Sequence, residues 1–173
     1  MGTGYNEFST RWRLSYSPEE YTTLGGNTYY AEYYNSSIAT SSTVTFGISV
    51  PTNVTPKGRF ALESDGEVII RIKEAATYTG GSAINAFNLK RNSTNTDGIT
   101  FVSNPTVTNE GTRLESYYIG TGDLSNFARA EPESGDSVFW LLKTDTKYIV
   151  KITNQSGGAI NIKLSYQFHE HSI

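Results

Sequence analysis

Polar and apolar side chains alternate along several segments of the chain, which is the pattern of half-buried β-strands. The segment 67–73 carries valine or isoleucine at every second position from Val68 to Ile72, and three of its four other residues are charged. The segments 147–152 and 159–168 repeat this spacing. A period of two puts the apolar side chains of a strand on one face, so these segments predict a sheet with one buried and one water-exposed face.

The same signals predict about eight strands from residue 43 onward. Short runs rich in Val, Ile, Thr, Tyr and Phe are separated by turns that contain Gly, Asn, Asp or Ser. The expected strands are 43–50, 59–64, 67–73, 100–104, 113–119, 138–142, 147–153 and 159–168.

The connections between these strands are uneven in length. Short turns at 64–66, 144–145 and 154–158 are expected to be hairpin connections. Two long polar excursions, at 78–98 and 120–135, interrupt the series. Unequal loops favour an all-β, jelly-roll-like, two-sheet β-sandwich over a regular up-and-down barrel.

The first 42 residues differ from the rest because they are rich in aromatic side chains and poor in Val, Ile and Leu. Within them, Ser17 and Pro18 predict a helix start, and Gly25 predicts its end. Two interpretations stay open for residues 1–42: a peripheral layer of the sandwich domain 43–173, or an arm that contacts a partner. The aromatic residues that would contact the partner are Trp12, Tyr16, Tyr21, Tyr29, Tyr30, Tyr33 and Tyr34.

Composition excludes several function classes for the 173 residues. There is no cysteine, so disulfides and thiolate chemistry are absent. The net charge is −3 and the pI is about 5.4, which disfavours nucleic-acid binding. We see no signal peptide and no apolar run of about 20 residues, so we expect a soluble protein that spans no membrane.

Reactive side chains are not grouped in the way that catalysis or metal binding requires. The two histidines flank Glu170 near the end of the last strand, and a metal there would need further ligands from elsewhere. The segment 93–104 resembles part of an EF-hand loop but lacks its terminal glutamate. Glu131 and Glu133 pair two carboxylates in a loop, the only motif that suggests a glycosidase. We therefore expect no enzyme activity, catalytic residue, metal or cofactor.

Six segments of the chain resemble stretches of small virion structural proteins of tailed bacteriophages. They span more than half of the chain, leave the N-terminal third unmatched, and are structural rather than catalytic motifs. The segments are 70–83, 86–93, 115–122, 139–143 with 146–148, 152–157 and 166–171.

This resemblance implies a head decoration or cement protein on the surface of the virion, assembled in the host cytoplasm. Its partner would be the major capsid protein of the same virus, and the protein would form a homo-oligomer, with a trimer favoured. The alternatives are a virion adhesin or tail component, or a carbohydrate-binding β-sandwich module. The aromatic residues that could stack on sugars are Tyr78, Phe87, Tyr117 and Tyr118.

Overall fold

The computed structural model describes residues 18–120, 128–129 and 140–172, which form one helix and fourteen strands. The first elements are α1 (Pro18–Gly25), β1 (Thr28–Ile38), β2 (Thr43–Val50), β3 (Val54–Ser64), β4 (Val68–Glu74), β5 (Thr77–Thr79), β6 (Ser82–Ile84) and β7 (Phe87–Asn88). The others are β8 (Thr100–Ser103), β9 (Thr106–Asn109), β10 (Thr112–Ile119), β11 (Ala128–Arg129), β12 (Trp140–Leu141), β13 (Thr146–Asn154) and β14 (Ile160–Ser172).

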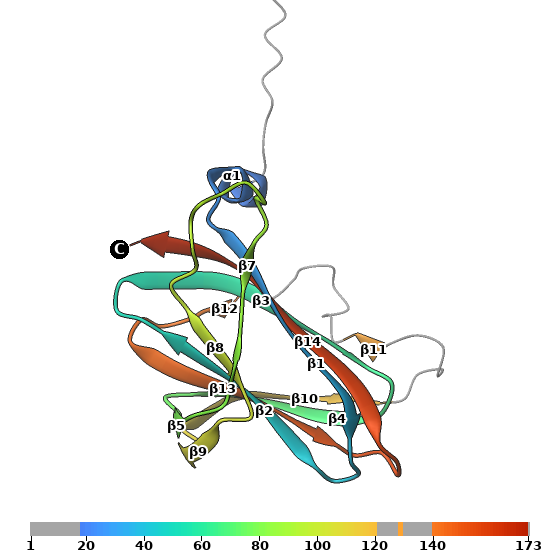
Figure 1. Cartoon of the computed structure of the whole chain (residues 1–173). Coiled ribbons are helices and arrows are strands. Elements are labelled where there is room, and N and C mark those ends of the chain that lie inside the picture. The colour runs from blue at the N-terminus through green and yellow to red at the C-terminus, as the bar shows by residue number, and fades with distance from the viewer. Residues whose placement is uncertain (1–17, 121–127, 130–139, 173) are drawn as a thin grey trace, which may run out of the picture.

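Two antiparallel sheets of six strands each form a sandwich (Figure 1). Sheet A has the order β11-β3-β14-β1-β7, with β12 also paired to β3, and sheet B has the order β10-β4-β13-β2-β8-β6. The strands pair in a nested order: β1 with β14, β2 with β13, β3 with β11 and β12, and β4 with β10. This is the two-sheet arrangement of a jelly roll, so the all-β, jelly-roll-like fold expected from the sequence is confirmed.

Strand β1 changes the expected division of the chain at residue 42. Each of the eight segments expected as strands from residue 43 onward contains a strand, and β2 has the expected bounds. However, β1 lies between β14 and β7 inside sheet A, with Tyr29 and Ala31 buried in the core. Residues 28–38 therefore belong to the sandwich and are neither an arm nor a peripheral layer. The alternation in β1 is hard to see in the sequence because tyrosines stand on both of its faces.

The expected hairpin connections are wrong. The turn at 64–66 joins β3 of sheet A to β4 of sheet B, and 154–158 joins β13 of sheet B to β14 of sheet A. The turn at 144–145 likewise leads from β12 in sheet A to β13 in sheet B. Turn residues reverse the chain locally, but they do not decide which strand becomes the hydrogen-bonded neighbour. In a nested topology most of these reversals cross from one sheet to the other.

Aromatic rings hold the two sheets together. Tyr166 stacks on Phe168 at 5.2 Å between ring centroids, and Phe168 stacks on Tyr29 at 5.5 Å. Phe101 of sheet B reaches Phe168 of sheet A at 5.5 Å. These rings are buried, and aromatic pairs add to the free energy gained from burial of their area. The long strands are thereby fixed, and their outer faces become rigid platforms.

A second, smaller cluster lies on the outer side of sheet B, under the two-stranded ribbon of β5 and β9. Tyr78 of β5 packs there with Ala76 and with Ile149 of β13. A Cβ atom at Gly47 would lie 2.9 Å from the ring of Tyr78, so glycine permits this close approach. Burial raises the pKa of Tyr78 to about 12.

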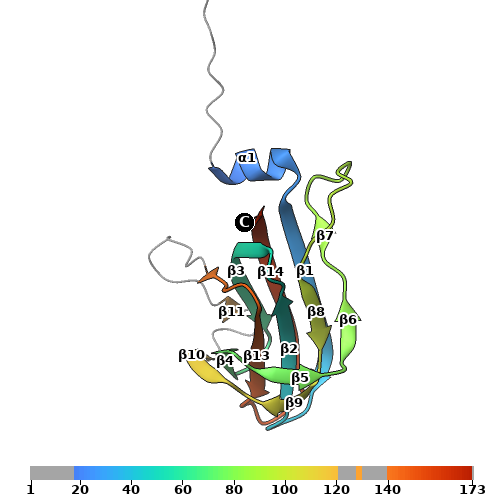
Figure 2. The ribbon, with the colours of Figure 1, turned by 90° about the vertical axis from the view of Figure 1, so that its left-hand side faces the viewer.

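Helix α1 lies across one end of the sandwich (Figure 2). It begins at Pro18 and ends at Gly25, as the sequence predicts, and Gly26 has a φ of 78°. The hydroxyl of Thr22 lies 3.0 Å from Nδ1 of His169, which ties the helix to β14. Within the described ranges, no helix is long and apolar enough to cross a membrane.

Candidate partner-binding face

The outer face of sheet A is the candidate functional site. Side chains at alternate positions of its strands point away from the core, because successive residues of a strand face opposite sides. The register aligns these residues across the sheet: Tyr30 lies between Phe87 and Gln167, and Tyr34 lies beside Lys163. The face comprises Tyr30, Glu32, Tyr34, Arg59, Ala61, Glu63, Phe87, Lys163, Ser165 and Gln167.

Aromatic side chains line the β1 and β7 side of this face. The rings of Tyr30 and Phe87 lie 5.2 Å apart, and the guanidinium of Arg91 lies 5.4 Å from the Phe87 ring centroid. Phe87 is 43% exposed and Tyr34 is 59% exposed. Exposed aromatic rings on a rigid sheet offer contact area at a low cost in side-chain entropy.

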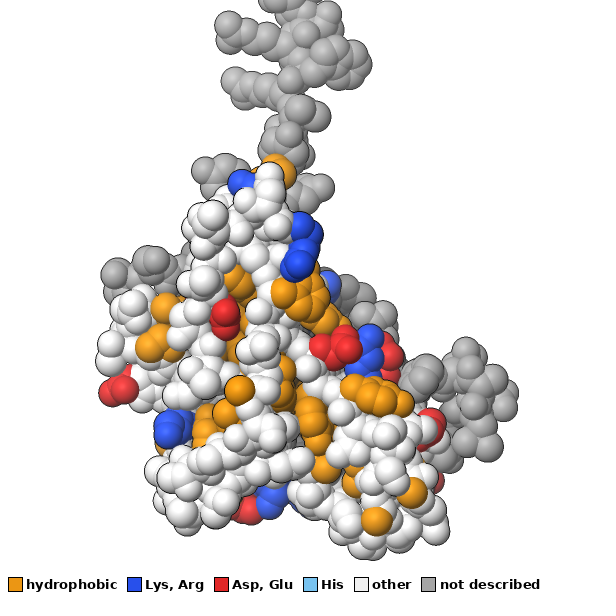
Figure 3. Space-filling view, in the orientation of Figure 1, with side chains coloured by type: hydrophobic (Ala, Val, Ile, Leu, Met, Phe, Trp, Pro, Cys, Tyr) orange, Lys and Arg blue, Asp and Glu red, His pale blue; other side chains and the backbone are white. Residues whose placement is uncertain are grey.

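Charged side chains fill the middle of the face and are paired with one another. Lys163 Nζ lies 3.4 Å from a carboxylate oxygen of Glu32 and 4.0 Å from one of Glu63. The hydroxyl of Tyr30 donates to the same Glu32 oxygen at 2.9 Å. Tyr30 and Glu32 together raise the pKa of Lys163 above its ordinary value of 10.5. Figure 3 shows this mixture, with basic and acidic side chains beside apolar ones where β1 and β14 run.

An amide and a guanidinium complete the polar part of the face. Arg59 Nη2 donates to Oε1 of Gln167 at 3.3 Å, from the neighbouring strand. These contacts hold the polar groups in fixed positions before any partner binds. Groups that are already paired would need little further ordering on contact with another molecule.

Of the tyrosines expected to contact a partner, two lie on this face and two do not. Tyr30 and Tyr34 point outward, but Tyr29 is 2% exposed and packs in the core, so its assignment as a partner-binding residue is wrong. Tyr33 points inward and is half-buried, and its hydroxyl accepts hydrogen bonds from Asn35 and Asn104. Trp12, Tyr16 and the side chain of Tyr21 lie outside the described residues.

The aromatic residues considered for sugar stacking are also divided. Tyr78 is buried under the β5–β9 ribbon, so its ring cannot stack on a sugar. Tyr117 is half-buried against the core, whereas Tyr118 is 61% exposed on the outer side of sheet B. Phe87 belongs to the outer face of sheet A.

The side chains of two residues of the C-terminal His-Glu-His segment are described, and each makes a hydrogen bond within the fold. His169 is buried at the end of β14, with Nδ1 2.8 Å from the hydroxyl of Thr28, while the Glu170 carboxylate accepts a hydrogen bond from the backbone N–H of Gly98. Burial is the main cause that raises the pKa of Glu170. No group of three potential metal ligands occurs among the described residues. Glu131 and Glu133 lie outside them.

The sequence pattern does not reveal the ionic part of the face. Glu32, Glu63 and Lys163 are far apart in the chain and meet only because β1, β14 and β3 are neighbours in sheet A. The alternation of polar residues in 159–168 indicates a water-exposed face, but it does not indicate which residues of the neighbouring strands lie beside that face.

No protein-family model matches the chain, and a search of curated proteins finds no match.

Proposed function

We propose that this chain is a non-enzymatic structural protein of a virus particle, which decorates the capsid of a tailed bacteriophage. The outer face of sheet A would bind the major capsid protein. The observation that carries the proposal is the set of exposed aromatic rings, led by Tyr34 and Phe87, beside ion pairs that are already formed. Such a face suits binding of a protein surface, because Tyr and Phe are enriched at interfaces.

Two further points support this function. Jelly rolls are a recurrent architecture of viral capsid and lectin domains. The sequence segments that resemble bacteriophage virion proteins include 70–83 and 166–171, which contribute to the long strands β4 and β14. Fold and resemblance alone do not identify a function, so the surface has to be tested directly.

A trimer on the capsid surface is part of the same proposal. Shell lattices contain three-fold axes, and a decoration protein that forms a closed ring at such an axis binds several shell subunits at once. Several weak contacts then act together, since the first contact raises the effective concentration for the others.

Binding to shell particles that lack the protein tests the proposal. The Tyr30→Ala, Tyr34→Ala double variant should lose most binding in a co-sedimentation experiment, because tyrosine is enriched among the few interface residues whose truncation costs about 2 kcal/mol or more. Tyr118→Ala, which removes an exposed tyrosine from the other sheet, is the matched control and should bind like the wild type. Equal binding by all three proteins would refute the role of the sheet A face.

A carbohydrate-binding module is the second candidate, because the same face combines an aromatic ring at Phe87 with the amide of Gln167 and the guanidinium of Arg59. Rings that stack on sugars and planar groups that hydrogen-bond hydroxyls are the chemistry of a sugar site. A glycan array probed with the intact protein separates the candidates. Binding to a defined glycan that Phe87→Ala abolishes would favour this alternative, whereas a blank array would remove it.

A further inference from the structure

The outer face of sheet B carries a concentration of positive charge in a chain whose net charge is −3. Five basic side chains stand at outward positions of β4, β10 and β13. We call this set the basic face. It comprises Arg71, Lys73, Arg113, Lys147 and Lys151.

The register brings like charges close together at the centre of the basic face. Arg71 lies directly opposite Lys151 on the neighbouring strand, and Lys73 follows Arg71 two residues along the same strand. Side chains directly opposite one another in an antiparallel pair have Cβ atoms about 5 Å apart, so two cations there repel each other. Arg71 makes no hydrogen bond or ion pair with the residues that the structure describes, so its charge is not compensated by a contact.

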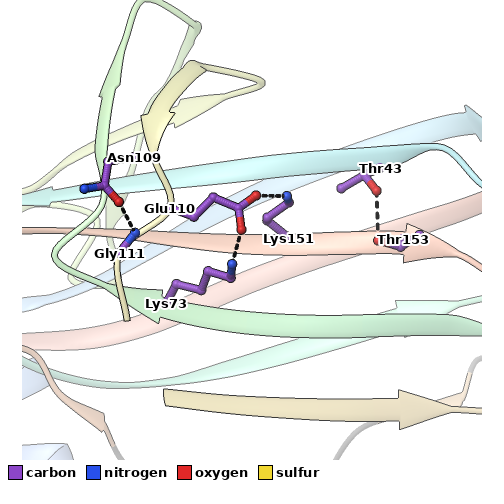
Figure 4. Close-up of polar contacts among 7 residues, drawn as sticks. All are labelled: Thr43, Lys73, Asn109, Glu110, Gly111, Lys151 and Thr153. Atoms are coloured by element: carbon purple, nitrogen blue, oxygen red, sulfur yellow. Dashed lines mark hydrogen bonds and ion pairs between the residues drawn. The ribbon is translucent and has the colours of Figure 1, made fainter. Parts of the chain in front are cut away.

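One carboxylate already occupies part of this cationic surface. Glu110, in the turn between β9 and β10, accepts from the ammonium groups of both Lys73 and Lys151 (Figure 4). The turn is held by Gly111, whose N–H donates to Oδ1 of Asn109 at 2.9 Å and whose φ is 70°. The two lysines lower the pKa of Glu110 to about 2. The face thus binds a carboxylate supplied by the chain itself, while Arg71 beside it is left without one.

We infer that the basic face binds an extended acidic polypeptide segment, whose carboxylates pair with Arg71 and compete with Glu110 for Lys73 and Lys151. Every second side chain of an extended peptide lies on the same side at a spacing of about 6.6 Å, which is also the spacing of Arg71 and Lys73 along β4. An acidic peptide therefore places successive carboxylates over successive cations. This inference does not depend on the proposed function of sheet A.

A single-stranded nucleic acid fits this surface less well. Such ligands need several aromatic platforms along a basic groove. Near Arg71 one exposed aromatic ring, that of Tyr118, lies diagonally across on β10. The other outward side chains nearby include Ser116 opposite Arg71, and Thr43 and Thr153, whose hydroxyls lie 2.8 Å apart. Hydroxyl groups add hydrogen-bond donors for carboxylate oxygens.

Fluorescence anisotropy with a labelled peptide of four Glu-Thr repeats tests the inference at low ionic strength. The intact protein should bind this peptide, and added salt should weaken the complex. Arg71→Ala should weaken binding about tenfold, since a hydrogen-bonded charge contributes roughly 1.5 kcal/mol or more. Lys90→Ala removes an exposed cation remote from the basic face and is the control that should leave binding unchanged.

Glu110→Gln should change the affinity for the peptide in the opposite direction from Arg71→Ala. Loss of the competing carboxylate should tighten peptide binding several-fold, which a variant that merely damages the fold would not do. Circular dichroism confirms that each variant retains its strands. No binding by the wild type at low salt, or weaker binding by Glu110→Gln, would overturn the inference. Tighter binding of heparin than of the acidic peptide, with the same dependence on Arg71, would also overturn the assignment to a polypeptide.

Discussion

Neighbouring tyrosines of β1 have opposite environments, because successive side chains of a strand point to opposite faces. Tyr29 is 2% exposed and stacks on Phe168, whereas Tyr34 is 59% exposed. We predict that Tyr29→Ala lowers the free energy of unfolding by about 3–5 kcal/mol. Tyr34→Ala should change it by less than about 0.5 kcal/mol. Urea denaturation measures both values, and equal losses would contradict the assignment of the two faces.

A glycine in the β9–β10 turn is required both for its conformation and for space. Gly111 has a φ of 70°, and an added Cβ would clash with the carbonyl oxygen of Glu74. Gly80 has a φ of 63°, but nothing lies within 4 Å of its added Cβ. We predict that Gly80→Ala costs about 1 kcal/mol of unfolding free energy, from backbone strain alone. Gly111→Ala should cost about 2–4 kcal/mol, because the clash adds to that strain.

Calorimetric melting temperatures of the two glycine variants check this difference. A Gly111→Ala protein as stable as Gly80→Ala would show that the turn moves away from β4 without cost.

The ion pairs of Glu110 predict a specific dependence of stability on pH. The folded-state pKa of Glu110 is lowered from 4.5 to about 2, so its contribution is fully present above pH 4.5 and is lost as the pH falls toward 2. Because Glu110 is 47% exposed, this contribution is at most about 1 kcal/mol. Urea midpoints of the wild type and Glu110→Gln should differ at neutral pH and converge near pH 2. A difference between the two midpoints that grows as the pH falls would contradict a stabilising role of the Glu110 ion pairs.

At the scale of elements, the sequence predicted what depends on local pattern. Helix α1 and the strand segments from residue 43 onward follow from capping residues and alternation. Strand β1 was missed because Tyr30 and Tyr34 on its outer face hide the contrast with Tyr29 on its inner face. The aromatic residues Tyr30 and Tyr34 of the candidate site are predicted from the tyrosine-rich composition of the N-terminal segment. The Glu32–Lys163–Glu63 group depends instead on the order of the strands in sheet A, which no local pattern of the sequence encodes.

The position of β1 determines which truncation the protein tolerates. Removal of residues 1–42 deletes a strand that pairs with both β14 and β7, and uncovers the rings of the core. We predict that this truncated chain does not fold, whereas a chain that begins at residue 17 retains every described element and folds. Amide proton exchange of β14 reports the difference. Protected β14 amides in the shorter chain would show that β1 is dispensable.

At the scale of the whole molecule, the sandwich presents two unlike surfaces. The outer face of sheet A carries aromatic rings and paired charges, and that of sheet B carries the basic face with Arg71 at its centre. The two sheets of the jelly roll pack against each other, so these surfaces lie on opposite sides of the core. The two proposed partners would therefore bind on opposite sides of the protein.

The proposed assembly at a three-fold axis predicts a self-associated protein. Sedimentation equilibrium should give three times the 19.1 kDa mass of one chain. A mass of a single chain at every concentration up to the millimolar range would exclude a stable trimer in solution.

The copy number of this protein in purified virus particles tests whether it decorates the capsid. Quantitative mass spectrometry against the major shell protein gives the ratio. We expect a simple fraction of the shell protein, as for a component that occupies equivalent sites across the capsid lattice. A handful of copies per particle, or none, would contradict it.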